Sequence, residues 1–138
     1  MNDAVQRLID EAEIRNLLAR IAQLSDEGGL DDYIACFSES AVWGGAGFPE
    51  RKGHAAILAG ARERRATGTA GPGSQSRHLI STSVVEIDGD HARVRSIFLF
   101  YRETKAAPKL DRMGVWEDVL ARTATGWKLA SRTIAQPE

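Results

Sequence analysis

The stretch RHLISTSVVEIDGDHARVRSIFLFY, residues 77–101, decides the fold that this sequence predicts. Residues 77–88 and 92–103 are rich in β-branched and aromatic side chains, which favour β-strands. Between them, Asp88-Gly89-Asp90 is typical of a tight hairpin turn. The pattern continues with two more strands and a turn, predicted at residues 112–122, 127–134 and 124–126. The second half of the chain therefore predicts an antiparallel meander.

Helical spacing of apolar side chains dominates the first half of the chain. Apolar residues recur at helical spacing from Val5 and Leu8 to Ile21, which predicts a helix over residues 3–25. Gly28-Gly29 ends this helix. Two shorter helices, a short strand and a loop are predicted at residues 30–37, 54–67, 41–43 and 44–53. Because the helices precede the strands, the sequence predicts an α+β class and a single domain over residues 1–138.

Between the two halves lies a segment rich in glycine and proline, from Gly68 to Ser76. It has no apolar anchor and cannot hold regular structure, so we expect it to be mobile. Since it leads directly into the strand that begins at Arg77, we also expect it to border the entrance of any pocket there.

Composition excludes several classes of function. The 138 residues include 19 acidic and 18 basic ones, so no charge excess indicates a nucleic-acid or membrane partner. The basic run at Arg62, Arg64 and Arg65 is interpreted as a solvated helix face. The single cysteine, Cys36, excludes an internal disulfide and is expected in the core. With no apolar run long enough for a membrane span and no signal peptide, we expect a soluble, cytoplasmic protein.

The long strands carry apolar side chains on both faces. Phe98 and Phe100 project to one side of their strand, whereas Ile97, Leu99 and Tyr101 project to the other. A sheet with two apolar faces needs cover on each of them. We expect a pocket under the helices on one face and a second copy of the chain on the other, in a homo-oligomer.

Two residues far apart in the chain carry the predicted chemistry. Asp26 shares a helical row with Leu18 and Ala22, so its carboxylate either reaches solvent at the helix end or needs a buried partner. His78 opens the first long strand, and histidine can take a proton near neutral pH. By strand alternation His78 shares a face with the acidic Glu86, so an inward His78 requires a β-bulge. The alternative interpretations are a carboxylate that braces the helix end and a structural histidine.

Several short segments, in conserved order and spacing along nearly the whole chain, carry a family resemblance: Ile14-Arg15-Asn16-Leu17-Leu18, the Asp26 turn, Tyr33-Ile34-Ala35-Cys36-Phe37, Ala41-Val42-Trp43, Gly53-His54-Ala55-Ala56-Ile57, Arg77-His78, Val85 to Asp90 and Gly126-Trp127-Lys128-Leu129. The chain thereby resembles the SnoaL-like branch of the nuclear-transport-factor-2-like superfamily. This resemblance implies a cone-shaped, strongly curved, mainly antiparallel sheet that three N-terminal helices close around an apolar pocket. It also favours a trimer over a dimer.

Within that family the chain is similar to scytalone dehydratase, bile-acid 7α-dehydratase and lindane dehydrochlorinase, which eliminate a leaving group from a small cyclic substrate. Asp26 and His78 match their Asp–His pair, and Arg132 matches a pocket arginine of the dehydrochlorinase. A surface ion pair is the alternative for Arg132. Five residues before the aspartate, where the relatives carry tyrosine or lysine, this chain has Ile21, which has no proton to give.

The resemblance and the residues together predict a cofactor-independent lyase of the dehydratase type, or an isomerase, acting on a small cyclic or aromatic compound. His78 would be the general base, Asp26 would fix its tautomer, and Arg132 would stabilise negative charge. The residues expected to bind substrate are Ile21, Trp43, Phe98, Phe100, Tyr101 and Trp116. The alternatives are a non-catalytic binding module and an accessory subunit of an aromatic-ring oxygenase. We expect no metal, organic cofactor, nucleic-acid partner or membrane partner.

Overall fold

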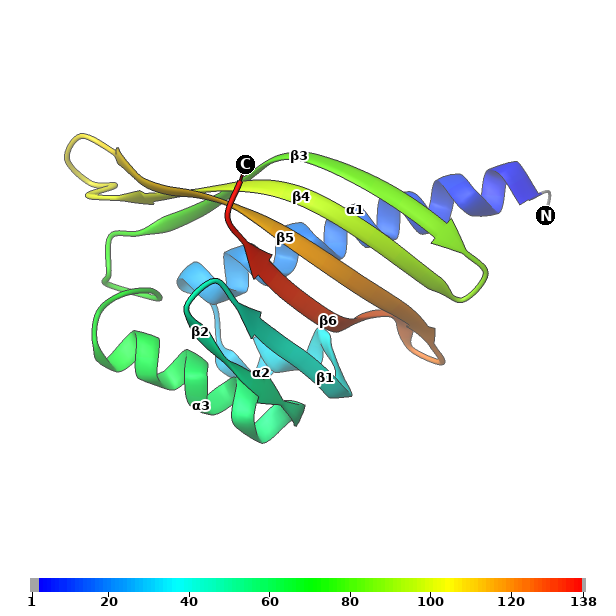
Figure 1. Ribbon diagram of the computed structural model, residues 1–138, viewed down its shortest axis with the longest axis horizontal. Coiled ribbons are helices and arrows are strands. Elements are labelled where there is room, and N and C mark those ends of the chain that lie inside the picture. The colour runs from blue at the N-terminus through cyan, green and yellow to red at the C-terminus, as the bar shows by residue number, and fades with distance from the viewer. Residues whose placement is uncertain (1–2, 138) are drawn as a thin grey trace.

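Residues 3–137 of the chain are described by a computed structural model, in which three helices and six strands follow one another. In chain order they are α1 (Asp3–Glu27), α2 (Leu30–Ala35), β1 (Phe37–Gly45), β2 (Phe48–Lys52), α3 (Gly53–Ala66), β3 (Arg77–Asp88), β4 (His91–Arg102), β5 (Lys109–Thr123) and β6 (Gly126–Ala135). The strands form one sheet in the order β2-β1-β6-β5-β4-β3 (Figure 1). All neighbouring strands are antiparallel except β1 and β6, which are parallel.

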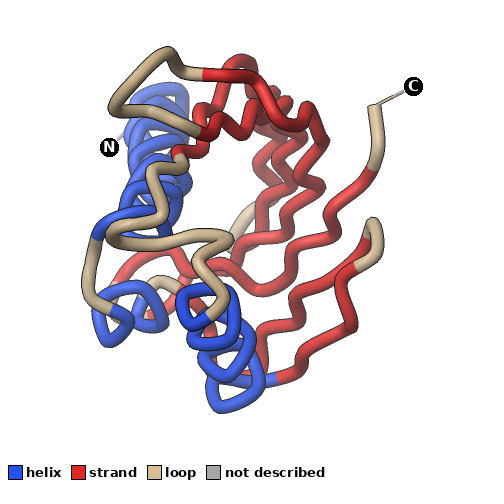
Figure 2. The backbone as a smooth tube through the Cα atoms, turned by 90° about the vertical axis from the view of Figure 1, so that its left-hand side faces the viewer, coloured by secondary structure: helices blue, strands red, loops and turns tan. Residues whose placement is uncertain are grey.

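The predicted α+β class and the curved sheet are confirmed. Figure 2 shows the sheet curling so that the helices lie together on one side of it. The meander runs from β3 to β6, and its first turn has Gly89 at φ +61°, a conformation that glycine adopts without steric cost. Within the described residues, no helix is both long and apolar enough to cross a membrane.

One part of the secondary-structure prediction was wrong: residues 44–53 are not a loop throughout. The helix predicted to reach residue 37 ends at Ala35, and the following strand runs over Phe37–Gly45. That strand turns back through three consecutive residues with positive φ, at Gly45, Ala46 and Gly47, into β2. Strand β2 lies at the edge of the sheet, where Pro49 costs no ladder hydrogen bond between two neighbours. The glycines and the proline therefore form a hairpin.

A β-bulge in β3 decides which way the residues near its start face. Ile80 pairs with Phe98, but Thr82 pairs with Ile97, so Ser81 is an extra residue on β3. Before the bulge His78 and Ile80 are the more buried residues, and after it Ser83, Val85 and Ile87 are. The bulge that an inward His78 requires is thus present, and Glu86 is exposed as expected.

Helix α1 supplies much of the core, but only from its second half. Ile14, Leu18 and Ile21 are at most 1% exposed. Val5 and Leu8, which the helical spacing placed in the core, are 43% and 66% exposed. They are exposed because they lie on the face of α1 opposite Asp10, whose side chain belongs to the buried stripe of this helix.

A buried carboxylate fixes the middle of α1 to the sheet. The two carboxylate oxygens of Asp10 accept hydrogen bonds from the guanidinium of Arg122 on β5, each at 2.8 Å. Gln6 and the indole N–H of Trp127 donate to Oδ1 as well, at 3.0 and 3.3 Å. The Arg122 guanidinium lowers the pKa of Asp10 from 3.8 to about 2. The folded state therefore favours the ionised carboxylate.

Asp10→Asn should lower the free energy of unfolding at pH 7 by about 1–2 kcal/mol, because it removes a charge-assisted pair. Since the pKa of Asp10 is lower in the folded chain, its stabilisation is complete above pH 4 and is lost as the pH falls toward 2. Urea unfolding at pH 7 and pH 2 measures both effects. Asp90→Asn, which breaks only an exposed pair with the same Arg122, is the control and should cost far less. Equal losses for the two variants would contradict this role of Asp10.

The segment between α3 and β3 has an apolar anchor, contrary to the sequence-based expectation. Ala70 is only 8% exposed. The backbone N–H of Thr69 donates to the carbonyl of Arg64 at 3.0 Å, and the Ser74 hydroxyl donates to the carbonyl of Gly71 at 2.6 Å. The first bond holds the start of the segment against the end of α3, and the second closes a turn within the segment, whose mobility stays a prediction.

The face of the sheet away from the helices exposes large apolar side chains: Leu79, Val84, Leu110, Met113 and Val119 are 36–65% exposed. Large apolar side chains exposed on one face of a sheet favour an interaction site there. We propose that a second copy of the chain covers this face, and we expect a trimer. Light scattering at micromolar concentration should give about three times the 15.0 kDa chain mass. A monomer mass would contradict the proposal.

Candidate active site

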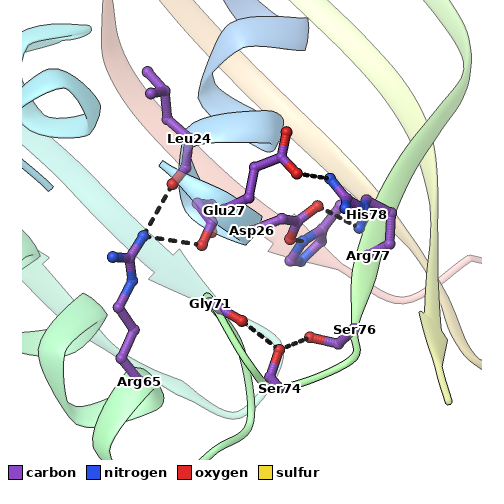
Figure 3. Close-up of polar contacts among 10 residues, drawn as sticks. Leu24, Asp26, Glu27, Arg65, Gly71, Ser74, Ser76, Arg77 and His78 are labelled. Carbon is purple, nitrogen blue, oxygen red and sulfur yellow. Dashed lines mark hydrogen bonds and ion pairs between the residues drawn. The ribbon is translucent and has the colours of Figure 1, made fainter. Parts of the chain in front are cut away.

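The site begins with a contact between the end of α1 and the start of β3, drawn in Figure 3. The Asp26 Oδ1 atom lies 2.7 Å from Nδ1 of His78, and Oδ2 accepts a hydrogen bond from the His78 backbone N–H at 2.8 Å. The side chain of Asp26 is 1% exposed and that of His78 is 19% exposed. Both carboxylate oxygens thus have partners, and the partner that the apolar row on α1 requires is His78.

This contact selects one tautomer of His78. A carboxylate only accepts hydrogen bonds, so the proton of the neutral imidazole lies on Nδ1. Nε2 then carries a lone pair, and it has no hydrogen-bond partner within residues 3–137. A fixed imidazole with a free lone pair is the arrangement of a general base.

Two arginines hold the end of α1 that carries Asp26 (Figure 3). Arg65 reaches over from α3 and donates from Nη2 to the carbonyls of Leu24 and Gly28, at 3.0 and 2.8 Å. A cation at this position complements the negative end of the helix dipole. Arg77, next to His78, pairs with Glu27 at 3.0 Å. The Glu27–Arg77 pair therefore joins α1 to β3, as the Asp26–His78 contact does, and Arg65 joins the same helix end to α3.

A cavity of about 240 Å³ opens beside this pair. His78 lines it, together with five of the six residues predicted to bind substrate: Ile21, Trp43, Phe98, Phe100 and Trp116. The sixth, Tyr101, does not line it, because neighbouring strand residues face opposite sides of the sheet and Phe100 faces inward. The volume lies just below the roughly 300–1,000 Å³ of pockets for drug-sized ligands. A substrate of one or two rings therefore fits better than a four-ring compound.

Aromatic rings form the wall next to His78. The ring centroids of His78 and Phe100 are 4.5 Å apart, and those of Phe98 and Trp116 are stacked at 4.7 Å. Gly114, opposite Phe98 on β5, leaves room for this stack, since a Cβ atom there would lie 2.4 Å from the Phe98 ring. The wall suits a flat apolar ligand.

Arg132 lines the cavity, but it belongs to a buried ion pair. Its Nε and Nη2 atoms donate to the two carboxylate oxygens of Asp118 at 2.8 and 2.9 Å. Its guanidinium carbon lies 3.9 Å from the centroid of the Trp116 ring. The surface pair considered from the sequence is excluded, because the two side chains are 4% and 0% exposed. Asp118 offsets much of the charge of Arg132, so Arg132 contributes oriented N–H donors more than a net charge.

The cavity residues that were missed from the sequence include Tyr33 on α2, Arg64 on α3, Arg102 on β4 and Arg112 on β5. The interpretation of the basic run as a solvated face was wrong for Arg65, which is half-buried and donates to carbonyls at the end of α1. It was also wrong for Arg64, which lies three and seven residues after Ala61 and Ile57 on the buried side of α3. Arg112 likewise shares a strand face with Trp116. The helical and strand spacing could have found both. Burial raises the pKa of the Tyr33 phenol, so this side chain keeps its proton.

No group of three or more histidine, cysteine, aspartate or glutamate side chains in the described chain is arranged to hold a metal ion. Within this part of the chain, the polar groups of the cavity are instead arginines, hydroxyls and one imidazole. This donor set is suited to holding a ligand that accepts hydrogen bonds.

Comparison with solved structures shows the same fold. A nuclear-transport-factor-2-like protein with a cystatin-like fold from Novosphingobium aromaticivorans has a TM-score of 0.81 and 26% identity, over 98% of this chain and 86% of that one. From the same organism, a candidate scytalone dehydratase has a TM-score of 0.78 and 20% identity, over 98% and 89%. A candidate aromatic ring hydroxylase has a TM-score of 0.74 and 21% identity, over 95% and 91%.

Comparison with curated proteins finds none that matches the chain. The model of the SnoaL-like domain family matches residues 6–133, which include every element described above except the first turn of α1 and the last residues of β6. The chain therefore belongs to the SnoaL-like domain family.

Proposed function

We propose that this cavity is a cofactor-independent active site in which Nε2 of His78 removes a proton from a carbon of a small cyclic substrate. The observation that carries the proposal is the 2.7 Å contact between Asp26 and Nδ1 of His78, which leaves Nε2 free beside the cavity. When His78 takes the proton, the imidazolium lies against a buried carboxylate that balances its charge. General-base catalysis of this kind is worth about 10²–10⁴-fold in rate.

The electrons of the broken C–H bond move into an enolate or expel a leaving group on the neighbouring carbon. The Arg132 N–H groups are available to stabilise the enolate, and the Tyr33 hydroxyl, which lines the same cavity, is available to a departing oxygen. Ile21 stands at the position where the related dehydratases carry a proton donor, and its side chain cannot donate a proton. Tyr33 is buried and protonated, and we assign to it the transfer of a proton to a departing oxygen.

A non-catalytic binding module is the second candidate, and Ile21 favours it. The side chain is 1% exposed and lines the cavity, so this wall supplies shape but no proton. An accessory role in an aromatic-ring oxygenase belongs to the same candidate, since a candidate ring hydroxylase shares the fold. In either case, ligands would bind without losing a proton to His78.

His78→Ala should abolish proton abstraction, and Asp26→Asn should weaken it by losing control of the tautomer. The assay follows exchange of carbon-bound hydrogen for deuterium by NMR, in D₂O, over a panel of cyclic ketones that includes 1-tetralone. Exchange needs only abstraction and return of a proton, so it does not depend on the later fate of the substrate. We expect at least about a 100-fold loss in His78→Ala.

His91→Ala is the matched control for this assay, because His91 is exposed in the hairpin between β3 and β4. It should leave exchange unchanged, and melting temperatures should show that all variants fold. Ketones that bind to the wild-type chain without any enzyme-dependent exchange would contradict the catalytic proposal and favour the binding module.

Tyr33→Phe should separate elimination from isomerisation. If Tyr33 protonates the leaving group, the variant keeps deuterium exchange but loses release of water from a β-hydroxy ketone. Mass analysis of the products measures the release, and NMR measures the exchange in the same samples. Equal rates of release in Tyr33→Phe and the wild-type chain would show that Tyr33 is not the acid.

A further inference from the structure

The cavity beside His78 has an uneven distribution of charge. Four arginines line it, Arg64, Arg102, Arg112 and Arg132, and no aspartate or glutamate of the described chain does. Two of these arginines have carboxylate partners, one buried and one at the surface. Arg132 pairs with Asp118, and Arg102 pairs with Asp111 at 3.2 Å.

The other two arginines have no such partner. Neither Arg64 nor Arg112 forms an ion pair with a carboxylate of residues 3–137. The Nε atom of Arg112 is buried and has no hydrogen-bond partner in this part of the chain. A buried donor without an acceptor costs free energy, as does a guanidinium held away from carboxylates. Such a group indicates that the acceptor comes from a ligand.

Aromatic rings cover the faces of these guanidinium groups. The Arg112 guanidinium carbon lies 5.4 Å from the ring centroid of Phe48 and 5.9 Å from that of Phe100. The Arg64 carbon lies 4.6 Å from the ring centroid of Trp43. The Trp43 and Phe48 rings are themselves in contact, with centroids 5.2 Å apart. With their faces covered, the guanidiniums offer the N–H donors at their edges, which match a planar carboxylate.

The sheet register places Phe100 between Arg112 and the base, His78. His78 pairs with Phe100 across β3 and β4, and Phe100 pairs with Arg112 across β4 and β5. Two strand spacings separate the backbones of His78 and Arg112, about 10 Å. A ring lying over Phe100 can therefore present a carbon to Nε2 of His78 at one end and a substituent to Arg112 at the other.

We propose that the substrate of this cavity is an anion: a cyclic compound of one or two rings whose carboxylate binds to Arg112 and Arg64. This inference rests on the proposed function for the identity of the site, and it adds the chemical class of the substrate. The carboxylate positions the ring by binding on the side away from His78, and it does not take part in the proton transfer. Burial lowers the pKa of the Arg64 guanidinium, and a bound anion would offset that cost.

The test compares carboxylates with neutral amides of the same shape. Calorimetry measures the binding of benzoate, benzamide, 1-naphthoate and 1-naphthamide to the wild-type chain, Arg112→Gln, Arg64→Gln and His78→Ala. We expect the wild-type chain to prefer each carboxylate over its amide by about 10–100-fold. Arg112→Gln and Arg64→Gln should each lose most of this preference, while binding of the amides changes little. High salt should weaken carboxylate binding in the wild-type chain.

Arg95→Gln is the matched control, because Arg95 is exposed on the same sheet and does not line the cavity. It should keep the full preference for carboxylates. His78→Ala should also keep it, so a failure of catalysis and a failure of anion binding give different results. Equal affinity for carboxylates and amides, no binding of either pair, or an unchanged preference in both Arg112→Gln and Arg64→Gln would overturn the proposal.

Discussion

The carboxylate of Asp26 holds the end of α1 against the start of β3, because both of its oxygens accept hydrogen bonds from His78. Burying an ionised carboxylate is unfavourable unless such partners are present. The same contact fixes the plane and the tautomer of the imidazole, so packing and chemistry depend on one interaction. The bulge at Ser81 makes it possible by turning His78 inward while Glu86 remains in solvent. Arg65 then holds the helix end from α3.

The arginines that line the cavity differ in whether a carboxylate neutralises them. Arg132 is neutralised by Asp118 and presents fixed N–H donors, as a group that stabilises charge during a reaction should. Arg64 and Arg112 keep their charge, and their faces are covered by aromatic rings. This arrangement costs free energy, since it gathers like charges in a small apolar space. The cost is offset when a substrate brings its own negative charge.

Much of this could be predicted from the sequence. The meander was visible from its alternation and from Asp88-Gly89-Asp90, and α1 from its helical spacing. The resemblance to SnoaL-like proteins brought Asp26 and His78 together across 52 positions of chain, which no local pattern could do. The hairpin between β1 and β2 was missed because its glycines and proline indicated a loop. The exposure of Val5 and Leu8 was missed because the buried face of α1 carries Asp10 at this point, and a search for apolar spacing passes over an aspartate.

The cavity arginines show a second limit of the sequence. Arg64 and Arg112 occupy inward positions by spacing, yet arginine is usually a solvated residue, so composition argued against them. Only the positions of Phe48, Trp43 and Phe100 around them show that they are enclosed. Charge in a cavity depends on which carboxylates lie behind its wall, and that is a property of tertiary structure.

Asp26 should fix His78 as the tautomer whose Nε2 lone pair faces the cavity. The ¹⁵N chemical shifts of the His78 ring, measured by NMR at a pH where the imidazole is neutral, distinguish the two tautomers. We expect a protonated Nδ1 and an unprotonated Nε2, and a shift toward a mixture of tautomers in Asp26→Asn. A protonated Nε2 in the wild-type chain, or shifts that Asp26→Asn leaves unchanged, would contradict it.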